Sequence, residues 1–132
     1  MIKKSQIPIF IINLIILTIF TILFAHRRNY EFIMYIGVII FFLLLIIATN
    51  RKVNYPDYTL WGLTLWSLLH MSGGGLNVKG GRLYELILIQ MSETYQVFRY
   101  DQLVHIIGFG VSTLIMFHLI KPLIDKKNKK WA

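Results

Sequence analysis

The fold of this chain is set by residues 7–25, which read IPIFIINLIILTIFTILFA. These 19 residues contain no charged side chain. A helix rises about 1.5 Å per residue, so a stretch of this length crosses the roughly 30 Å hydrocarbon core of a bilayer. Lys3 and Lys4 precede it as in a signal peptide, but the apolar run is long and no small-residue cleavage site follows it. We therefore predict a retained transmembrane helix.

Three further apolar stretches continue this pattern. We predict spans at about 32–48, 57–73 and 101–123, in addition to the span at 7–25. The short polar linker between the first two spans favours an antiparallel hairpin. The predicted fold class is all-α: a polytopic transmembrane helical bundle of four spans, built from a single domain over residues 1–132.

The third span is the least regular of the four. Asp57 is its expected N-cap, and its apolar part runs from Tyr58 to about Met71, just before Gly73-Gly74-Gly75. Such a helix reaches only about 21 Å. Either it continues through the glycines, or it ends there and the following loop dips inward. A glycine run is typical of a flexible helix exit.

The segment over residues 82–97 is predicted to be a fifth, short helix. Leu83 and Leu86 give it an apolar side, whereas Glu85 and Glu93 would each be costly at the bilayer centre. We therefore expect this helix to lie at the membrane interface or to re-enter between the spans.

The charge of the chain indicates a membrane partner. The formal net charge is +8 and the mean hydropathy is +0.61. Because the basic residues flank the apolar runs, we expect them to meet anionic lipid head groups rather than nucleic acid. The expected partners are the lipid bilayer and a second copy of the chain or another membrane protein.

The distribution of Lys and Arg predicts the orientation. With four spans, nine basic residues lie on the side of the termini and five on the other. The nine are Lys3, Lys4, Arg51, Lys52, Lys121, Lys126, Lys127, Lys129 and Lys130; the five are Arg27, Arg28, Lys79, Arg82 and Arg99. The positive-inside rule then predicts a multi-pass protein of the cell (inner or plasma) membrane with cytoplasmic N- and C-termini.

Three ionisable residues form the candidate site. His70 lies near the outer end of the third predicted span, and Asp101 and His105 lie in the first turns of the fourth. Asp101 and His105 are four residues apart and share one helix face. The predicted topology thus places all three at a similar depth, near the extracytoplasmic face. Ionisable groups at this depth are expensive and mark candidate functional positions.

The site admits two functional interpretations and one structural one. Two imidazoles and a carboxylate are suited to a divalent metal such as Zn²⁺ or Fe²⁺. Alternatively, Asp101 orients a histidine for proton transfer, with Ser67 or Ser112 nearby. In the structural interpretation Asp101 caps the last helix and the histidines hydrogen-bond across a helix interface.

Several other side chains are expected to play no part in this site. His118 faces away from His105 and lies near the inner end, and His26 is expected to be solvated. Glu85 is a further candidate only if its segment folds over the site. The remaining large aromatic residues are expected at the membrane interfaces: Trp61, Trp66, Tyr84, Tyr95, Tyr100 and Trp131.

Three motifs resemble a known family. They are Leu69-His70-Met71-Ser72-Gly73-Gly74, then Tyr100-Asp101-Gln102-Leu103-Val104-His105, and Gly108-Phe109-Gly110. Over about residues 61–123 this pattern resembles the YjdF-like family of small bacterial and archaeal membrane proteins. The resemblance implies an all-helical inner-membrane fold and supports His70, Asp101 and His105 as a set. The chain departs from the family in lacking a His-Tyr-Thr-Tyr segment after the glycines and an acidic residue near the place of His118.

The sequence therefore predicts an integral membrane protein with a polar or metal-binding site at His70, Asp101 and His105. A lipid or lipid-linked substrate would reach such a site laterally. The alternatives are a non-enzymatic membrane scaffold or partner subunit, and a proton- or ion-handling oligomer.

Overall fold

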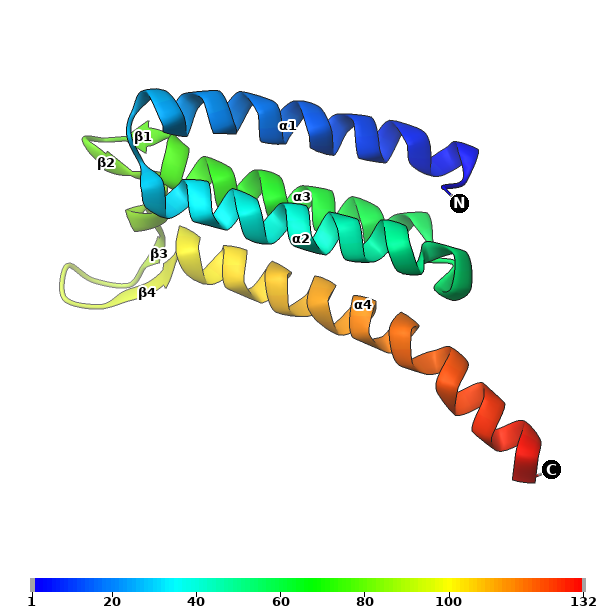
Figure 1. Ribbon diagram of the computed structural model, residues 1–132. Helices are drawn as coiled ribbons and strands as arrows, with labels where there is room; N and C mark the ends of the chain where they lie inside the picture. Colours follow the sequence, from blue (N-terminus) through cyan, green and yellow to red (C-terminus); the bar gives the residue numbers. More distant parts are fainter. Residues whose placement is uncertain (1, 132) are drawn as a thin grey trace.

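A computed structural model describes residues 2–131 of the chain. After a short 3-10 turn, η1 (Lys4–Gln6), this part of the chain forms four long helices. They are α1 (Ile7–His26), α2 (Tyr30–Val53), α3 (Asp57–Gly75) and α4 (Tyr100–Trp131). Successive helices run antiparallel, and the chain begins and ends at the same end of the bundle (Figure 1). The predicted order of four helices is therefore confirmed.

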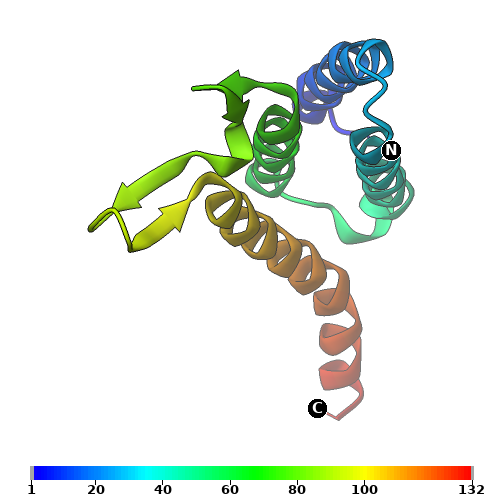
Figure 2. The ribbon, with the colours of Figure 1, turned by 90° about the vertical axis from the view of Figure 1, so that its left-hand side faces the viewer.

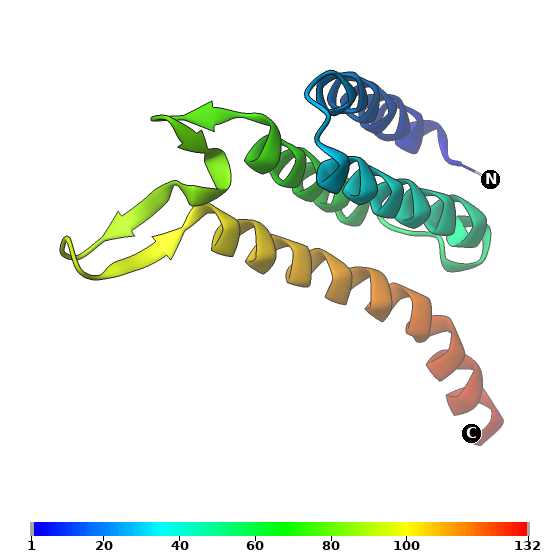
Figure 3. The same cartoon turned by 60° about the vertical axis from the view of Figure 1, so that its left-hand side comes forward.

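Helix α3 is the centre of the bundle. Viewed along the helices, α3 lies between the α1–α2 hairpin and α4 (Figure 2). Its buried apolar side chains belong to two clusters, one with Leu60 and Leu63 and the other with Met71. Helix α4 packs on α3 at its start and bends away toward its C-terminal end (Figure 3). Pro122 lies in this part of α4 and removes one backbone hydrogen bond there.

Within the described residues 2–131, three segments have the length and hydropathy of membrane spans. They are Lys4–His26, Tyr30–Val53 and Tyr100–Lys127. Three of the four predicted spans are thus supported as membrane-crossing helices. Helix α3 is not one of them, because polar residues such as Thr59, Thr64 and Ser67 lower its hydropathy. All three of those side chains are buried against neighbouring helices.

The helix predicted over residues 82–97 is wrong. Strands β1 (Asn77–Val78) and β2 (Gly81–Arg82) form one antiparallel hairpin, and β3 (Ile87–Gln90) and β4 (Gln96–Arg99) form another. Between them lies the 3-10 turn η2 (Leu83–Glu85). The apolar residues of this segment include β-branched Ile87, Ile89 and Val97, which favour extended backbone, and its polar residues supply turns.

Two courses were open for the glycine run, and the structure shows the first, a helix that continues, rather than the flexible exit typical of such a run. The helix continues through Gly73–Gly75, and all three glycines are buried. A Cβ on Gly74 would lie 1.9 Å from the ring of Phe32, and one on Gly73 would lie 2.7 Å from that of Tyr84. The glycines therefore admit aromatic rings against the helix backbone. The helix ends where the Arg27 guanidinium donates to the Gly75 carbonyl at 2.5 Å, a favourable position for a cation.

The start of α3 differs from the prediction by one residue. Asp57 is the first helical residue, and Pro56 occupies the N-cap position without a side-chain hydrogen bond. Proline has no N–H to satisfy, and its fixed φ suits the entry to a helix. The Asp57 carboxylate still lies in the first turn, where the helix dipole favours negative charge.

A buried polar cluster joins η1, α2 and the α2–α3 linker. The Asn50 side-chain amide donates to the Gln6 side-chain oxygen at 2.7 Å, and Gln6 donates to the Tyr55 carbonyl at 3.0 Å. The Tyr55 backbone N–H in turn donates to the Asn50 Oδ1 atom at 3.2 Å. All three residues are buried. This closed cycle ties together three segments that are distant in sequence.

A second polar contact joins α1 to α3. The Asn13 side-chain amide donates to the Thr64 hydroxyl at 2.6 Å and to the Ile9 carbonyl at 2.8 Å. Both side chains are buried, each in the middle part of its helix. Hydrogen bonds of this kind fix the register of helices in a bilayer, where apolar contact with lipid competes with apolar contact between helices.

Gly74→Ala is expected to destabilise the bundle by about 1–3 kcal/mol, because its methyl group would overlap the Phe32 ring. Gly37→Ala is the matched control, since no atom lies within 4 Å of a Cβ built there. The free energy of unfolding of both variants is measured on purified protein in mixed micelles, with increasing amounts of a denaturing detergent. Equal stability of the two variants would contradict the close approach.

Asn50→Leu is expected to lower the free energy of unfolding by about 1–3 kcal/mol, because it leaves the Tyr55 N–H without its partner. Thr18→Val is the control, since the exposed Thr18 hydroxyl bonds only to the Leu14 carbonyl of its own helix. The same unfolding assay applies. An equal loss of unfolding free energy in the control would mean that the buried cycle stabilises the bundle no more than an exposed hydrogen bond within one helix does.

Candidate functional site

His70 is held near the C-terminal end of α3 by a tyrosine from the connecting segment. The Tyr84 hydroxyl donates to the His70 carbonyl at 3.0 Å and also contacts the His70 Nδ1 atom. Burial, with a smaller effect of Tyr100, raises the pKa of Tyr84 above its usual value, so its hydroxyl stays protonated. A phenol has one proton, and the carbonyl receives it. In that arrangement the His70 Nδ1 atom carries the ring proton and donates to the phenol oxygen.

Aromatic rings enclose the His70 imidazole. The Trp66 indole stacks on it with centroids 5.3 Å apart and planes inclined by 14°. Tyr35 meets its edge at 5.0 Å, and Phe32 lies at 5.9 Å. These contacts fix the plane of the imidazole.

His105 is held in the same tautomer by its own helix. Its Nδ1 atom lies 2.7 Å from the backbone carbonyl of Asp101. A carbonyl only accepts hydrogen bonds, so Nδ1 carries the proton and Nε2 keeps a free lone pair. Among the described residues, the hydrogen bonds of His70 and His105 use Nδ1 and leave each Nε2 without a partner.

Both histidines line one pocket between α2 and α4. Its volume is about 350 Å³, and its lining residues are Tyr35, Val38, Phe42, Trp66, His70, His105, Gly108, Phe109 and Ser112. A second pocket of about 230 Å³ adjoins it and shares Phe42, Trp66, Gly108 and Ser112. The second pocket continues along α4 to Leu119 through apolar side chains. We call the two together the α2–α4 groove: it is polar at the histidines and apolar beyond them.

Asp101 does not join the histidines in this groove. Its carboxylate accepts the backbone N–H of Gln102 at 2.8 Å, and only its backbone carbonyl reaches His105. It is also not a helix cap: α4 begins at Tyr100, and the Gln102 side chain accepts the Arg99 N–H at 2.8 Å. Within the described residues, no three His, Asp or Glu side chains are placed to hold a metal ion. The metal-binding role of His70, Asp101 and His105 stays a prediction.

The other candidate residues from the sequence lie in different parts of the structure. Ser112 lines the α2–α4 groove, whereas Ser67 is buried and its hydroxyl has no partner among the described residues. Glu85 lines a different pocket, beside the β1–β2 hairpin. His118 lies 3.4 Å from the Tyr58 hydroxyl near the other end of the bundle, as expected from its helix position.

Sequence reasoning missed the aromatic residues around His70. Trp66 and Tyr84 were expected at the membrane interfaces, but both contact the imidazole instead. Trp66 precedes His70 by four residues, so their adjacency on one helix face was readable from spacing. The role of Tyr84 had no such signal, because it depends on the fold of the segment after α3. Tyr100 likewise donates inward, to the Leu69 carbonyl at 3.0 Å.

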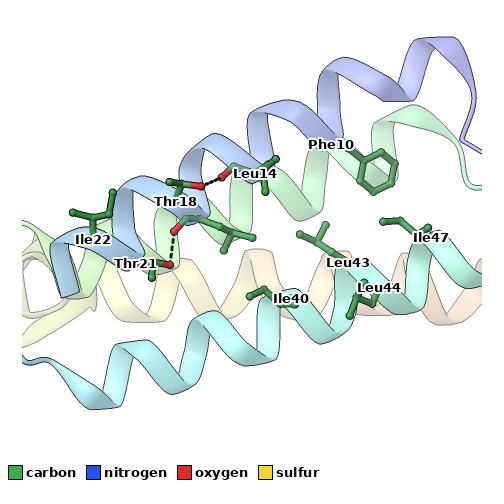
Figure 4. Close-up of a pocket in the computed structure, with 10 residues that line it drawn as sticks. Phe10, Leu14, Thr18, Thr21, Ile22, Ile40, Leu43, Leu44 and Ile47 are labelled. Atoms are coloured by element: carbon green, nitrogen blue, oxygen red, sulfur yellow. Dashed lines mark hydrogen bonds between the residues drawn. The ribbon is translucent and has the colours of Figure 1, made fainter. Parts of the chain in front are cut away.

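A separate pocket of about 550 Å³ lies between α1 and α2 (Figure 4). Its lining is apolar apart from Thr18 and Thr21, and both hydroxyls donate back to carbonyls of their own helix, at 2.7 and 2.6 Å. This pocket offers no free polar group. Of these two apolar sites, only the α2–α4 groove is lined by histidines.

These features define a small helical membrane protein with a polar site at one end of the bundle. The family described as "Predicted membrane protein (DUF2238)" matches residues 7–132, and the chain belongs to it. This agrees with the resemblance to the YjdF-like family found in the sequence. No curated protein and no solved structure matches the chain significantly.

Tyr84→Phe is expected to release the tautomer of His70, because the hydroxyl that accepts from Nδ1 is removed while the ring stays. Nitrogen-15 NMR of the imidazoles in micelles should show the Nδ1–H form of His70 in the wild type and a mixture in the variant. Tyr95→Phe is the control, since Tyr95 is exposed on the β3–β4 hairpin. A wild-type protein with the Nε2–H form of His70 would contradict the assignment.

Proposed function

We propose that this chain is a four-span protein of the cell membrane that binds an amphiphilic lipid in the α2–α4 groove. One observation carries the proposal: a lateral apolar groove ends at two histidines, and neither Nε2 atom has a hydrogen-bond partner among the described residues. The lipid tail would occupy the apolar part, and its head group would meet His70 and His105.

The dimensions of the groove support a single lipid chain. Along α4 it runs from His105 to Leu119, a rise of about 21 Å. One leaflet of the hydrocarbon core is about 15 Å thick, so the groove is long enough for a chain that enters from one leaflet. Pockets for small molecules are usually apolar with a few placed polar groups, and this groove has that composition.

The histidines set the chemistry of the head group. A neutral imidazole with Nδ1 protonated accepts a hydrogen bond or a proton at Nε2. The groove is therefore suited to a head group with hydroxyl or other donor groups. If the bound lipid is a substrate, His70 and His105 are the groups that would take its proton.

Helix α3 is proposed as the fourth span. Its 19 residues rise about 28 Å, close to the thickness of a hydrocarbon core. Asp57, in its first turn, is its only acidic or basic residue other than His70. Its polar side chains Thr59, Thr64 and Ser67 are buried, so lipid would not meet them. A central helix needs less hydropathy than a lipid-facing one.

The proposed orientation places both termini in the cytoplasm. Nine Lys and Arg residues lie on the side of the termini and five on the other. Both termini lie at the same end of the bundle (Figure 1), which supports placing them on the same side of the membrane. The histidine end of the groove would then face the extracytoplasmic side.

Ser112→Phe is expected to block the groove and to lower its photolabelling by a lipid several-fold, because Ser112 lines both of its pockets. The probe is a single-chain phospholipid with a diazirine in its acyl chain, added to nanodiscs that hold the purified protein. Labelled residues are mapped by mass spectrometry, and Phe42, Trp66 and Phe109 should dominate in the wild type.

Thr113→Phe is the matched control for this experiment. Thr113 follows Ser112 on α4, is exposed, and lies outside the lining of the groove. It should label as the wild type does. Uniform labelling of all lipid-facing helices in the three proteins would overturn the proposal and favour a scaffold or partner-subunit role.

A further inference from the structure

The β3–β4 hairpin carries large apolar side chains that the rest of the chain leaves uncovered. Met91 and Tyr95, at its tip, are 81% and 71% exposed. Ile89 and Val97, on its two strands, are 54% and 50% exposed. Exposed apolar clusters of this kind mark contact with a membrane or with another protein.

The hairpin extends away from the bundle, both sideways and past the ends of the helices (Figures 1 and 2). Viewed along the helices, it projects beyond their outline (Figure 2), and in Figure 1 it leaves from the end that holds the α1–α2 turn and the β1–β2 hairpin. Its base is fixed at the start of α4, where the Tyr100 N–H donates to the Leu86 carbonyl at 2.9 Å. Tyr100 also begins the third of the apolar candidate spans. The hairpin thus starts at the depth where α4 enters the bilayer.

The neighbouring β1–β2 hairpin has the opposite character. It lies at the same end of the bundle and carries Asn77, Lys79 and Arg82. Between Ile87 and Arg99, by contrast, Glu93 at the turn is the only acidic residue and Arg99 at the base the only basic one. The side chains of the β1–β2 hairpin therefore favour water, whereas those of the β3–β4 hairpin favour an apolar environment.

We propose that the β3–β4 hairpin inserts the side chains of its tip into the lipid interface beside the bundle. The insertion is shallow, because both edges of a two-stranded sheet carry unpaired backbone groups that hydrocarbon cannot satisfy. The backbone lies among head groups and water, while Met91 reaches the acyl chains. Tyr95 is suited to this boundary, where its ring is apolar and its hydroxyl stays hydrated. The hairpin acts as an interfacial anchor for the end of the bundle that holds the histidines.

Spin labelling tests this anchor directly, because the sequence contains no cysteine and single-cysteine variants are unambiguous. Met91→Cys carries a nitroxide, and the protein is reconstituted in vesicles of phosphatidylcholine and phosphatidylglycerol. The ratio of collisions with oxygen to collisions with a water-soluble nickel complex should be several-fold higher than for Lys79→Cys. Lys79 lies in the β1–β2 turn and serves as the aqueous control.

Two results would overturn the proposal. Equal ratios at the two positions would place the tip of the β3–β4 hairpin in water. Dipolar broadening of the Met91→Cys spectrum that disappears on dilution with unlabelled protein would show that a second copy covers the hairpin. Both variants change exposed residues outside the helices, and unchanged unfolding in detergent confirms that they fold.

Discussion

The close approach of aromatic rings to the backbone of α3 is the contact on which the rest of the structure depends. Phe32 from α2 and Tyr84 from η2 both occupy space that a side chain at Gly74 or Gly73 would fill. Through Phe32, α2 reaches the end of the central helix; through Tyr84, the connecting segment folds back onto it. The same phenol then fixes His70. The same group of aromatic contacts therefore packs the helices and positions His70.

Polar contacts reinforce this arrangement where apolar packing is least selective. In a bilayer, an apolar helix face contacts lipid as well as it contacts another helix, so hydrogen bonds specify which helices pair. Asn13 and Thr64 serve this purpose between α1 and α3. Gln6, Asn50 and Tyr55 do so at the end of the bundle that holds the termini. The opposite end is held by aromatic packing and by Arg27, and it is there that the groove opens toward His70.

The candidate site was only partly readable from the sequence. Its histidines were found because ionisable groups are conspicuous within apolar runs, and the four-residue spacing of Asp101 and His105 gave their shared face. Spacing did not reveal that Asp101 contributes its carbonyl rather than its carboxylate to His105. Nor did it reveal Tyr84, whose place depends on a turn that the helical pattern of residues 82–97 concealed.

The sequence alone determined that the chain is a membrane protein with at least three apolar helices, because hydropathy and length are local properties of each segment. It also determined the order of four helices and placed His70 and His105 near the same end of the bundle. Only the tertiary structure decided that α3 continues through its glycines, that residues 87–99 form a hairpin, and that a groove joins the histidines. These features arise from contacts between segments far apart in the chain, and such contacts leave no periodic signal in either segment.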